Sequence, residues 1–136
     1  MRGWSERTMN DSGKIAALKG LRVLVVEDEA LVALQLEDML GELGCAVVGP
    51  ASRVGQALQL LDQQQVDAAV LDLNIAGELV YPVADELTNR GLPYIFATGY
   101  GATALMAPYR GRPVLDKPYS RRELLQAMLD TLQRVE

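Results

Sequence analysis

Short apolar runs of this sequence end in polar residues that could carry chemistry. Several of these residues are carboxylates, one is a hydroxyl and one is an ammonium group. Carboxylates gathered within ~5 Å repel by roughly 3 kcal/mol per pair at an effective dielectric near 20, so they need a cation or a raised pKa. An oxygen-only set with vacant positions suits Mg²⁺, which uses one or two carboxylates beside a phosphate. The groups are residues 27–29 (Glu-Asp-Glu), Asp72 with Asn74, Thr98 with Gly99, and Asp116 with Lys117.

Lys117 is the only lysine in residues 21–136, where every other basic residue is arginine. A lysine is a compact point charge on a flexible stem, suited to hold a carboxylate at rest and a phosphoryl oxygen later. Thr98 adds a hydroxyl, Gly99 lets backbone approach a ligand, and Pro118 permits a cis peptide. A carboxylate nucleophile, a divalent metal, a hydroxyl and an ammonium group together favour transfer of a phosphoryl group to an aspartate.

These side chains need a scaffold that brings distant segments together. Five short apolar runs without alternation predict strands covered on both faces. Apolar residues between the runs recur at three- and four-residue steps, which predicts helices. The predicted strands are residues 21–26, 45–48, 68–71, 92–97 and 112–115, the last ending at Asp116. The predicted helices carry apolar residues at 31–43, at 54–61 behind a Ser52 cap, at 80–89, at 102–108, and at 124–132 behind a Ser120 and Glu123 capping pair.

Strands alternating with helices predict an α/β fold, a (βα)5 doubly wound parallel sheet with helices on both faces. The carboxyl ends of its strands face one edge, and ligands bind there where the strand order reverses. If the first and third strands are neighbours at that point, Glu27, Asp28 and Asp72 converge. The sequence therefore predicts a metal and phosphoryl site at this edge.

Composition narrows the classes of function. With 136 residues, one core is expected. We expect a flexible N-terminal tail at residues 1–20 and one domain at residues 21–134. The chain is 49% hydrophobic and 23% charged, and no apolar run approaches the ~18 residues of a membrane span. Residues 1–20 show no secretory signal, so we expect a cytoplasmic protein with no membrane partner.

Charge and cysteine usage exclude further classes. The chain has no histidine and one cysteine, Cys45, which excludes histidine-based nucleophiles, histidine or cysteine-rich metal sites and an internal disulfide. We expect Cys45 to be a buried strand residue. Residues 1–20 carry four basic and two acidic side chains, which leaves nine basic and sixteen acidic ones in residues 21–136. Direct binding of nucleic acid is therefore not expected.

Four blocks of the sequence resemble the motifs of the response-regulator receiver domain of two-component signalling: VVEDE at 25–29, VLDLN at 70–74, FATGY at 96–100 and LDKPY at 115–119. The resemblance spans residues 21–134. It implies a flavodoxin-like sheet with strand order 2-1-3-4-5, an order that spacing alone does not give. The residue roles that it implies are Glu27 and Asp28 as the acidic pair around Mg²⁺, Asp72 as phospho-acceptor and metal ligand, the backbone carbonyl of Asn74 as a further metal ligand, Thr98 as switch hydroxyl, and Lys117 as the phosphate-sensing lysine.

The resemblance also implies a signalling domain that promotes only its own phosphorylation and dephosphorylation, and is otherwise no enzyme. Its expected phosphoryl source is a histidine kinase or a phosphotransfer protein. The downstream protein is not named by the sequence, and a homodimer stays open. Because nineteen residues follow Lys117, we expect a stand-alone receiver that signals by protein contact.

Three features depart from the common receiver pattern. Val114 stands three residues before Lys117, where receivers often carry an aromatic residue, so we expect no aromatic switch there. FATGY resembles a receiver subgroup in which Tyr100 is a candidate for that role. Residues 75–78 lack the proline that many receivers have, and residues 101–111 look too short and irregular for a full fourth helix.

Other functions fit the same fold. A receiver-shaped module that binds partners without phosphorylation is the main alternative. A flavin carrier is disfavoured, because residues 27–29 are acidic where a phosphate loop would lie. A metal phosphohydrolase is disfavoured because Asn74 stands where its second catalytic aspartate would be.

Overall fold

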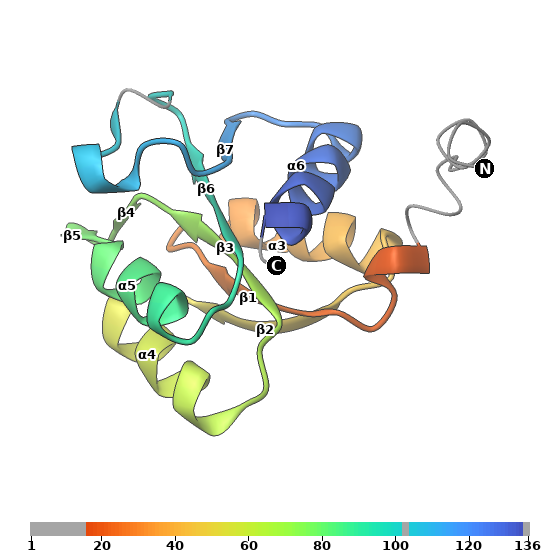
Figure 1. The fold of residues 1–136 in the computed structure, drawn as a ribbon, viewed down its shortest axis with the longest axis horizontal. Coiled ribbons are helices and arrows are strands. Elements are labelled where there is room, and N and C mark those ends of the chain that lie inside the picture. The colour runs from red at the N-terminus through yellow and green to blue at the C-terminus, as the bar shows by residue number, and fades with distance from the viewer. Residues whose placement is uncertain (1–15, 102–103, 135–136) are drawn as a thin grey trace.

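The computed structural model describes residues 16–101 and 104–134, which form a parallel five-stranded sheet between two layers of helices (Figure 1). The strand order is β2-β1-β3-β6-β7, with every neighbouring pair parallel. In chain order this is 2-1-3-4-5, as the sequence resemblance implied. The strands are β1 (Arg22–Val26), β2 (Ala46–Ala51), β3 (Ala68–Asp72), β6 (Tyr94–Thr98) and β7 (Val114–Asp116).

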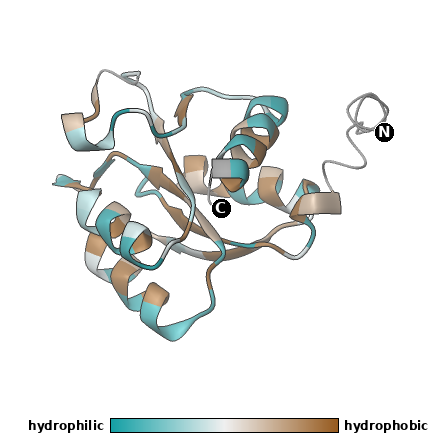
Figure 2. Ribbon diagram, in the orientation of Figure 1, coloured by the Kyte–Doolittle hydropathy of each residue, from teal (hydrophilic) through white to brown (hydrophobic). Residues whose placement is uncertain are grey.

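Two hydrophobic cores lie on opposite faces of the sheet. Val23 and Val25 of β1 pack in one core with the helices α3 (Ala30–Glu42) and α6 (Arg121–Arg134). Leu24 and Val26 pack in the other with α4 (Val54–Gln63) and α5 (Tyr81–Asn89). Both sets of strand residues are therefore buried, which explains the apolar runs without alternation. Figure 2 shows the hydrophobic residues concentrated in the strands and on the inner sides of the helices.

The two predicted helix caps had different outcomes. Ser120 and Glu123 form a reciprocal capping box: the Ser120 N–H donates to Glu123 Oε1 at 2.8 Å, and the Glu123 N–H donates to Ser120 Oγ at 3.1 Å. The Ser52 cap was wrong, because α4 begins at Val54 with Arg53 as its N-cap. The burial of Val54 sets where the helix meets the sheet, so Ser52 lies one residue too early and its N–H donates to Gln56 Oε1 instead.

Part of the segment expected to be a tail packs against the domain. Residues 16–18 are helical, and Leu18 is fully buried in the core beneath α3 and α6. The Gly20 N–H donates to the Gly44 carbonyl at 2.8 Å, which ties this segment to the start of β2. Cys45 is buried beside it, as expected, but it lies one residue before β2 rather than in the strand, with Sγ 3.7 Å from the Leu18 carbonyl oxygen. The expected tail at residues 1–15 lies outside the described residues.

The helix predicted at residues 102–108 is wrong over its described part. Residues 102 and 103 lie outside the described residues, and from 104 to 113 the helical structure is 3₁₀ rather than α: Ala104 and the turn η2 (Ala107–Tyr109). Pro108, at its centre, has no N–H for a helical hydrogen bond. Tyr109 stacks on Tyr81 of α5 with 4.1 Å between ring centroids, and the Tyr81 hydroxyl accepts the Met106 N–H at 2.9 Å. The segment is thus held to α5 by aromatic and polar contacts.

A small antiparallel hairpin follows β3 that the sequence did not predict. It consists of β4 (Asn74–Ile75) and β5 (Glu78–Leu79), joined by Ala76 and Gly77, which both have positive φ.

No helix within the described residues is long and apolar enough to span a membrane.

Candidate functional site

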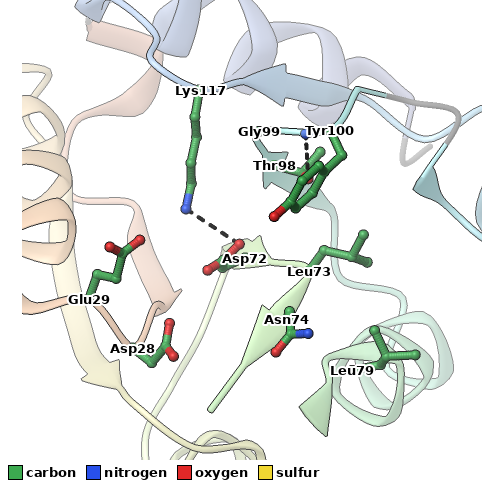
Figure 3. Close-up of a pocket in the computed structure, with 10 residues that line it drawn as sticks. All are labelled: Asp28, Glu29, Asp72, Leu73, Asn74, Leu79, Thr98, Gly99, Tyr100 and Lys117. Atoms are coloured by element: carbon green, nitrogen blue, oxygen red, sulfur yellow. Dashed lines mark hydrogen bonds and ion pairs between the residues drawn. The ribbon is translucent and has the colours of Figure 1, made fainter. Parts of the chain in front are cut away.

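The polar residues predicted to carry chemistry meet at one edge of the sheet. Asp72 and Thr98 are the last residues of β3 and β6, Asp28 follows β1, and Lys117 follows β7. They line a cavity of about 490 Å³ between the strand ends (Figure 3). Convergence follows from the parallel order, because all these strands end at the same edge. The cavity is lined by Asp28, Glu29, Asp72, Leu73, Asn74, Leu79, Thr98, Gly99, Tyr100 and Lys117.

Three carboxylates form the acidic part of the site. Glu27, Asp28 and Asp72 each offer one oxygen, and these oxygens lie within 4.8 Å of one another. Glu27 is buried, Asp72 is partly buried and Asp28 is exposed, so the cluster is open to solvent on one side. Such a donor set consists only of oxygens, which fits a hard cation such as Mg²⁺ that keeps part of its water shell.

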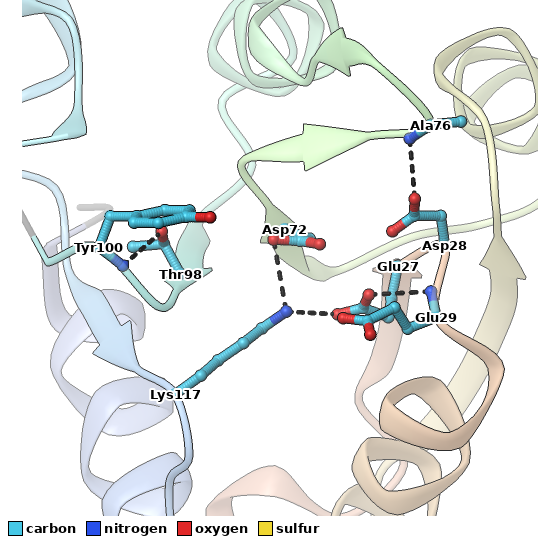
Figure 4. A network of polar contacts seen from close by, with 8 residues as sticks. All are labelled: Glu27, Asp28, Glu29, Asp72, Ala76, Thr98, Tyr100 and Lys117. Carbon is cyan, nitrogen blue, oxygen red and sulfur yellow. Dashed lines mark hydrogen bonds and ion pairs between the residues drawn. The ribbon is translucent and has the colours of Figure 1, made fainter.

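Lys117 lies between two of the carboxylates (Figure 4). Its Nζ is 2.8 Å from Glu27 Oε1 and 3.4 Å from Asp72 Oδ1. Burial by itself would lower the pKa of Lys117, but hydrogen bonds and the negative charges of Glu27 and Asp72 outweigh it and raise that pKa. Lys117 is therefore a fixed cation within the acidic cluster. The peptide bond to Pro118 is cis, a geometry that the sequence allowed.

Asp72 is the carboxylate whose protonation is most disturbed. Burial and then the charge of Glu27 raise its pKa, while Lys117 lowers it, and the result is a pKa of about 6. Crowded carboxylates are expected to need a cation or a raised pKa, and Asp72 has both: Lys117 lies beside it and its pKa is raised.

Thr98 and Tyr100 line the cavity on the side of Asp72 that faces away from Asp28 and Glu29. Thr98 is buried, and its Oγ1 accepts the Tyr100 N–H at 3.1 Å. The Tyr100 side chain is 81% exposed and lies at the cavity wall (Figure 3). The contact with the Tyr100 N–H uses Thr98 Oγ1 as an acceptor, so the hydroxyl hydrogen stays available to be donated.

Sequence reasoning missed the contribution of the β4–β5 hairpin. The Ala76 N–H donates to Asp28 Oδ2 at 2.9 Å, and Leu79 lines the cavity. Asn74, a predicted site residue, also lines the cavity, and its Oδ1 accepts the Gly77 N–H. Nothing in the side chain of alanine signals a backbone donor, although Gly77 indicates a turn.

Comparison with known protein families identifies the fold. The family model of the response regulator receiver domain matches residues 23–129. The chain belongs to this family. The receiver is similar to the solution structure of SdrG from Sphingomonas melonis Fr1, with 38% identity, a TM-score of 0.76, and coverage of 83% of this chain and 97% of SdrG.

Two further relatives are longer than this receiver. It is 28% identical to the response regulator PhyR from Brucella abortus, with a TM-score of 0.78 over 90% of this chain and 52% of PhyR. It is 29% identical to the transcriptional regulatory protein PdtaR from Mycobacterium tuberculosis over 111 residues. This match covers 79% of this chain and 54% of PdtaR. The chain thus spans about half the length of the curated relatives it matches.

Proposed function

We propose that this receiver accepts a phosphoryl group on Asp72 from a histidine kinase or phosphotransfer protein, in a reaction that depends on Mg²⁺. The observation that carries the proposal is the position of Asp72. Its carboxylate lies at the end of β3, grouped with Glu27 and Asp28 and 3.4 Å from Lys117 Nζ. This arrangement combines a nucleophile, a possible cation site and a fixed ammonium group.

The carboxylates of Glu27, Asp28 and Asp72, with the backbone carbonyl of Asn74, are the groups that would hold the metal. When bound, Mg²⁺ supplies positive charge beside the oxygens of the phosphoryl group. The three-carboxylate group and the exposure of Asp28 support this assignment, because the site is acidic and open to water.

The residues of the chain divide the transfer among them. An Asp72 oxygen forms the new bond to phosphorus as the bond from phosphorus to the donor's imidazole nitrogen breaks, and that nitrogen keeps the electron pair. Lys117 balances charge on the transferred oxygens, since its Nζ already lies within ion-pair distance of Asp72. The Thr98 hydroxyl donates its hydrogen to a phosphoryl oxygen, since the contact with the Tyr100 N–H uses Oγ1 only as an acceptor.

The signal would leave the site through protein contact. Phosphorylation adds about two negative charges at Asp72, draws Thr98 and Lys117 inward and changes the loops after β3 and β6. A partner that prefers one arrangement of these loops reads the change. PhyR from Bartonella quintana is described as an anti-anti-sigma factor and is 26% identical with a TM-score of 0.79. From that likeness we take only that the downstream partner is a protein.

The proposal is tested by intact-mass measurement after incubation with Mg²⁺ and acetyl phosphate. We expect the mass of one added phosphoryl group in the wild type, its loss after hydroxylamine treatment, and no gain with excess EDTA. SdrG has been studied in a BeF3-activated conformation, so the same phosphoryl mimic gives a second readout by NMR.

Two variants separate the acceptor from its neighbours. Asp72→Asn is expected to abolish the mass gain. Asp116→Asn removes an exposed carboxylate at the end of β7, and this variant is expected to show the same mass gain as the wild type. A gain that persists in Asp72→Asn, or no gain in the wild type, would overturn the proposal. Equal partner binding by the wild type and Asp72→Ala would favour a phosphorylation-independent module instead.

A further inference from the structure

The β4–β5 hairpin is fixed to the rest of the domain directly after the acceptor strand. Ile75 is fully buried in the core between the sheet and α5. The Val80 N–H donates to the Leu73 carbonyl at 2.9 Å and closes the base of the hairpin. The Gly77 N–H donates to Asn74 Oδ1 at 3.1 Å across the turn. These contacts give the turn a defined position above the acidic cluster.

Ala76 adopts an unusual backbone conformation in this turn. Its φ is 52°, and within the described residues it is the only residue other than glycine with positive φ. A Cβ makes this left-handed region unfavourable, so the conformation needs support from its surroundings. The buried Ile75 supplies part of that support. The other part is the hydrogen bond from the Ala76 N–H to Asp28 Oδ2 at 2.9 Å (Figure 4).

The three carboxylates of the cluster are held by different donors. Glu27 accepts hydrogen bonds from Lys117 Nζ and, at 3.1 Å, from the Glu29 N–H. Asp72 is paired with Lys117 at 3.4 Å. The donor to Asp28 is the Ala76 N–H. Because Asp28 is exposed, its side chain depends on this donor to stay in one orientation.

We propose that the backbone N–H of Ala76 is a positioning group for Asp28, and that the hairpin thereby sets the affinity of the acidic cluster for Mg²⁺. This inference rests on the proposed function. With Oδ2 bound to the amide, Oδ1 is the Asp28 oxygen available to the cation. Groups that orient metal ligands in this way change metal affinity by about 10- to 100-fold when they are removed. Because Asn74 begins the same hairpin, its carbonyl and the Asp28 carboxylate are positioned together.

The first test measures Mg²⁺ binding by calorimetry and by NMR shifts in the wild type and two variants. Ala76→Gly keeps the N–H and suits positive φ, so its affinity is expected to stay within about twofold of the wild type. Ala76→Pro removes the N–H and, because the proline ring fixes φ at about −65°, it also abolishes the positive φ of this turn. It therefore tests the turn as a whole and is expected to bind Mg²⁺ about tenfold more weakly, while the hydrogen-exchange test below isolates the N–H itself. Circular dichroism and the unfolding midpoint verify that both variants fold. Equal affinity in folded Ala76→Pro would overturn the inference.

The second test leaves the hairpin sequence intact and needs no metal. Hydrogen exchange of the Ala76 amide is measured in the wild type and in Asp28→Ala. We expect about tenfold faster exchange of this amide in the variant. The Gly77 amide, which is bonded to Asn74, is expected to keep its rate. Unchanged exchange at Ala76 would overturn the inference.

The outcomes distinguish this inference from the proposed function. If the wild type binds no Mg²⁺, the proposed function fails, and with it the role of the hairpin in metal affinity. If the wild type binds Mg²⁺ and Ala76→Pro binds it equally well, the positioning role fails and the proposed function stands.

Discussion

The 2.8 Å ion pair between Lys117 and Glu27 joins the ends of two strands that are not neighbours in the sheet. Glu27 follows β1 and Lys117 follows β7, and β3 and β6 lie between these strands. The lysine side chain therefore crosses the carboxyl edge of the sheet and passes beside Asp72. Its charge is thus paired with two carboxylates of the acidic cluster, Glu27 and Asp72.

Replacing this lysine is expected to destabilise the metal-free protein. In Lys117→Met the buried Glu27 carboxylate loses its counter-charge, and we expect a loss of about 2 kcal/mol in the free energy of unfolding. Mg²⁺ should restore part of the loss, because a cation bound to the folded state stabilises it. Urea unfolding with and without Mg²⁺ measures both effects. Lys117→Arg, which keeps the charge, should lose less, and full stability of Lys117→Met without metal would contradict the prediction.

The raised pKa of Asp72 predicts a dependence of stability on pH. The pKa rises from 3.8 to about 6 on folding, so the folded state binds this proton more tightly than the unfolded state does. The contribution to stability is full below pH 3.8 and is lost as the pH rises through about 6. Asp72→Asn removes this penalty. At pH 7.5 in EDTA we expect the variant to be more stable than the wild type by about 1–2 kcal/mol. This is less than the full pKa shift would give, because water at the open site screens the charge of Asp72.

The pH series supplies the control for that prediction. Near pH 4 the advantage of Asp72→Asn should shrink toward zero, since the wild-type carboxyl is then protonated in the folded state. Added Mg²⁺ at pH 7.5 should reduce the difference by stabilising only the wild type. A difference that is constant between pH 4 and pH 7.5 would show that Asp72 has an ordinary pKa in the folded protein.

Tyr81→Phe is expected to loosen residues 104–110 while leaving the rest of the domain intact. The substitution keeps the ring stacked on Tyr109 but removes the acceptor of the Met106 N–H, at a cost of about 1 kcal/mol. Hydrogen exchange of the Met106 amide should accelerate. Tyr94→Phe is the matched control, because the Tyr94 hydroxyl pairs with Thr88 Oγ1 instead. Similar exchange of Met106 in all three proteins would contradict a tether through Tyr81.

Leu18→Ala tests whether the segment before β1 belongs to the domain. Leu18 is fully buried, so its truncation should lower the free energy of unfolding by about 2–3 kcal/mol. Lys19→Ala changes an exposed neighbour and should stay within about 0.5 kcal/mol of the wild type. Chemical unfolding measures the free energy of unfolding of both variants. If the two are equally stable, residues 16–20 do not contribute to the stability of the domain.

The sequence was sufficient to predict the sheet and the convergence of the site. The buried strands appear as apolar runs, and the polar residues that follow four of the five runs mark the carboxyl edge. Given parallel strands with the first and third as neighbours, an order that came from the receiver resemblance, Asp28 and Asp72 must then lie near each other. Charge repulsion predicted that these carboxylates need a partner, and Lys117 occupies that place.

The features that the sequence did not predict depend on single contacts rather than on periodic patterns. The strands of the β4–β5 hairpin have two residues each, too few to show alternation, and its key group is the backbone N–H of Ala76. Leu18 ends a run of four apolar residues at 15–18, which is too short to predict burial by its periodicity. The predicted helix at 102–108 failed over its described part, where Leu105 is buried in the core and the chain then makes a 3₁₀ turn centred on Pro108, which has no N–H for a helical hydrogen bond.

The location of Cys45 gives the protein a built-in reporter. This sole thiol lies where residues 16–20 meet the start of β2, and burial raises its pKa to about 11. A thiol-reactive dye can reach it only when that corner opens, and even then the protonated form reacts slowly. The labelling half-time therefore follows local opening, so any ligand that tightens the domain lengthens it without an engineered probe.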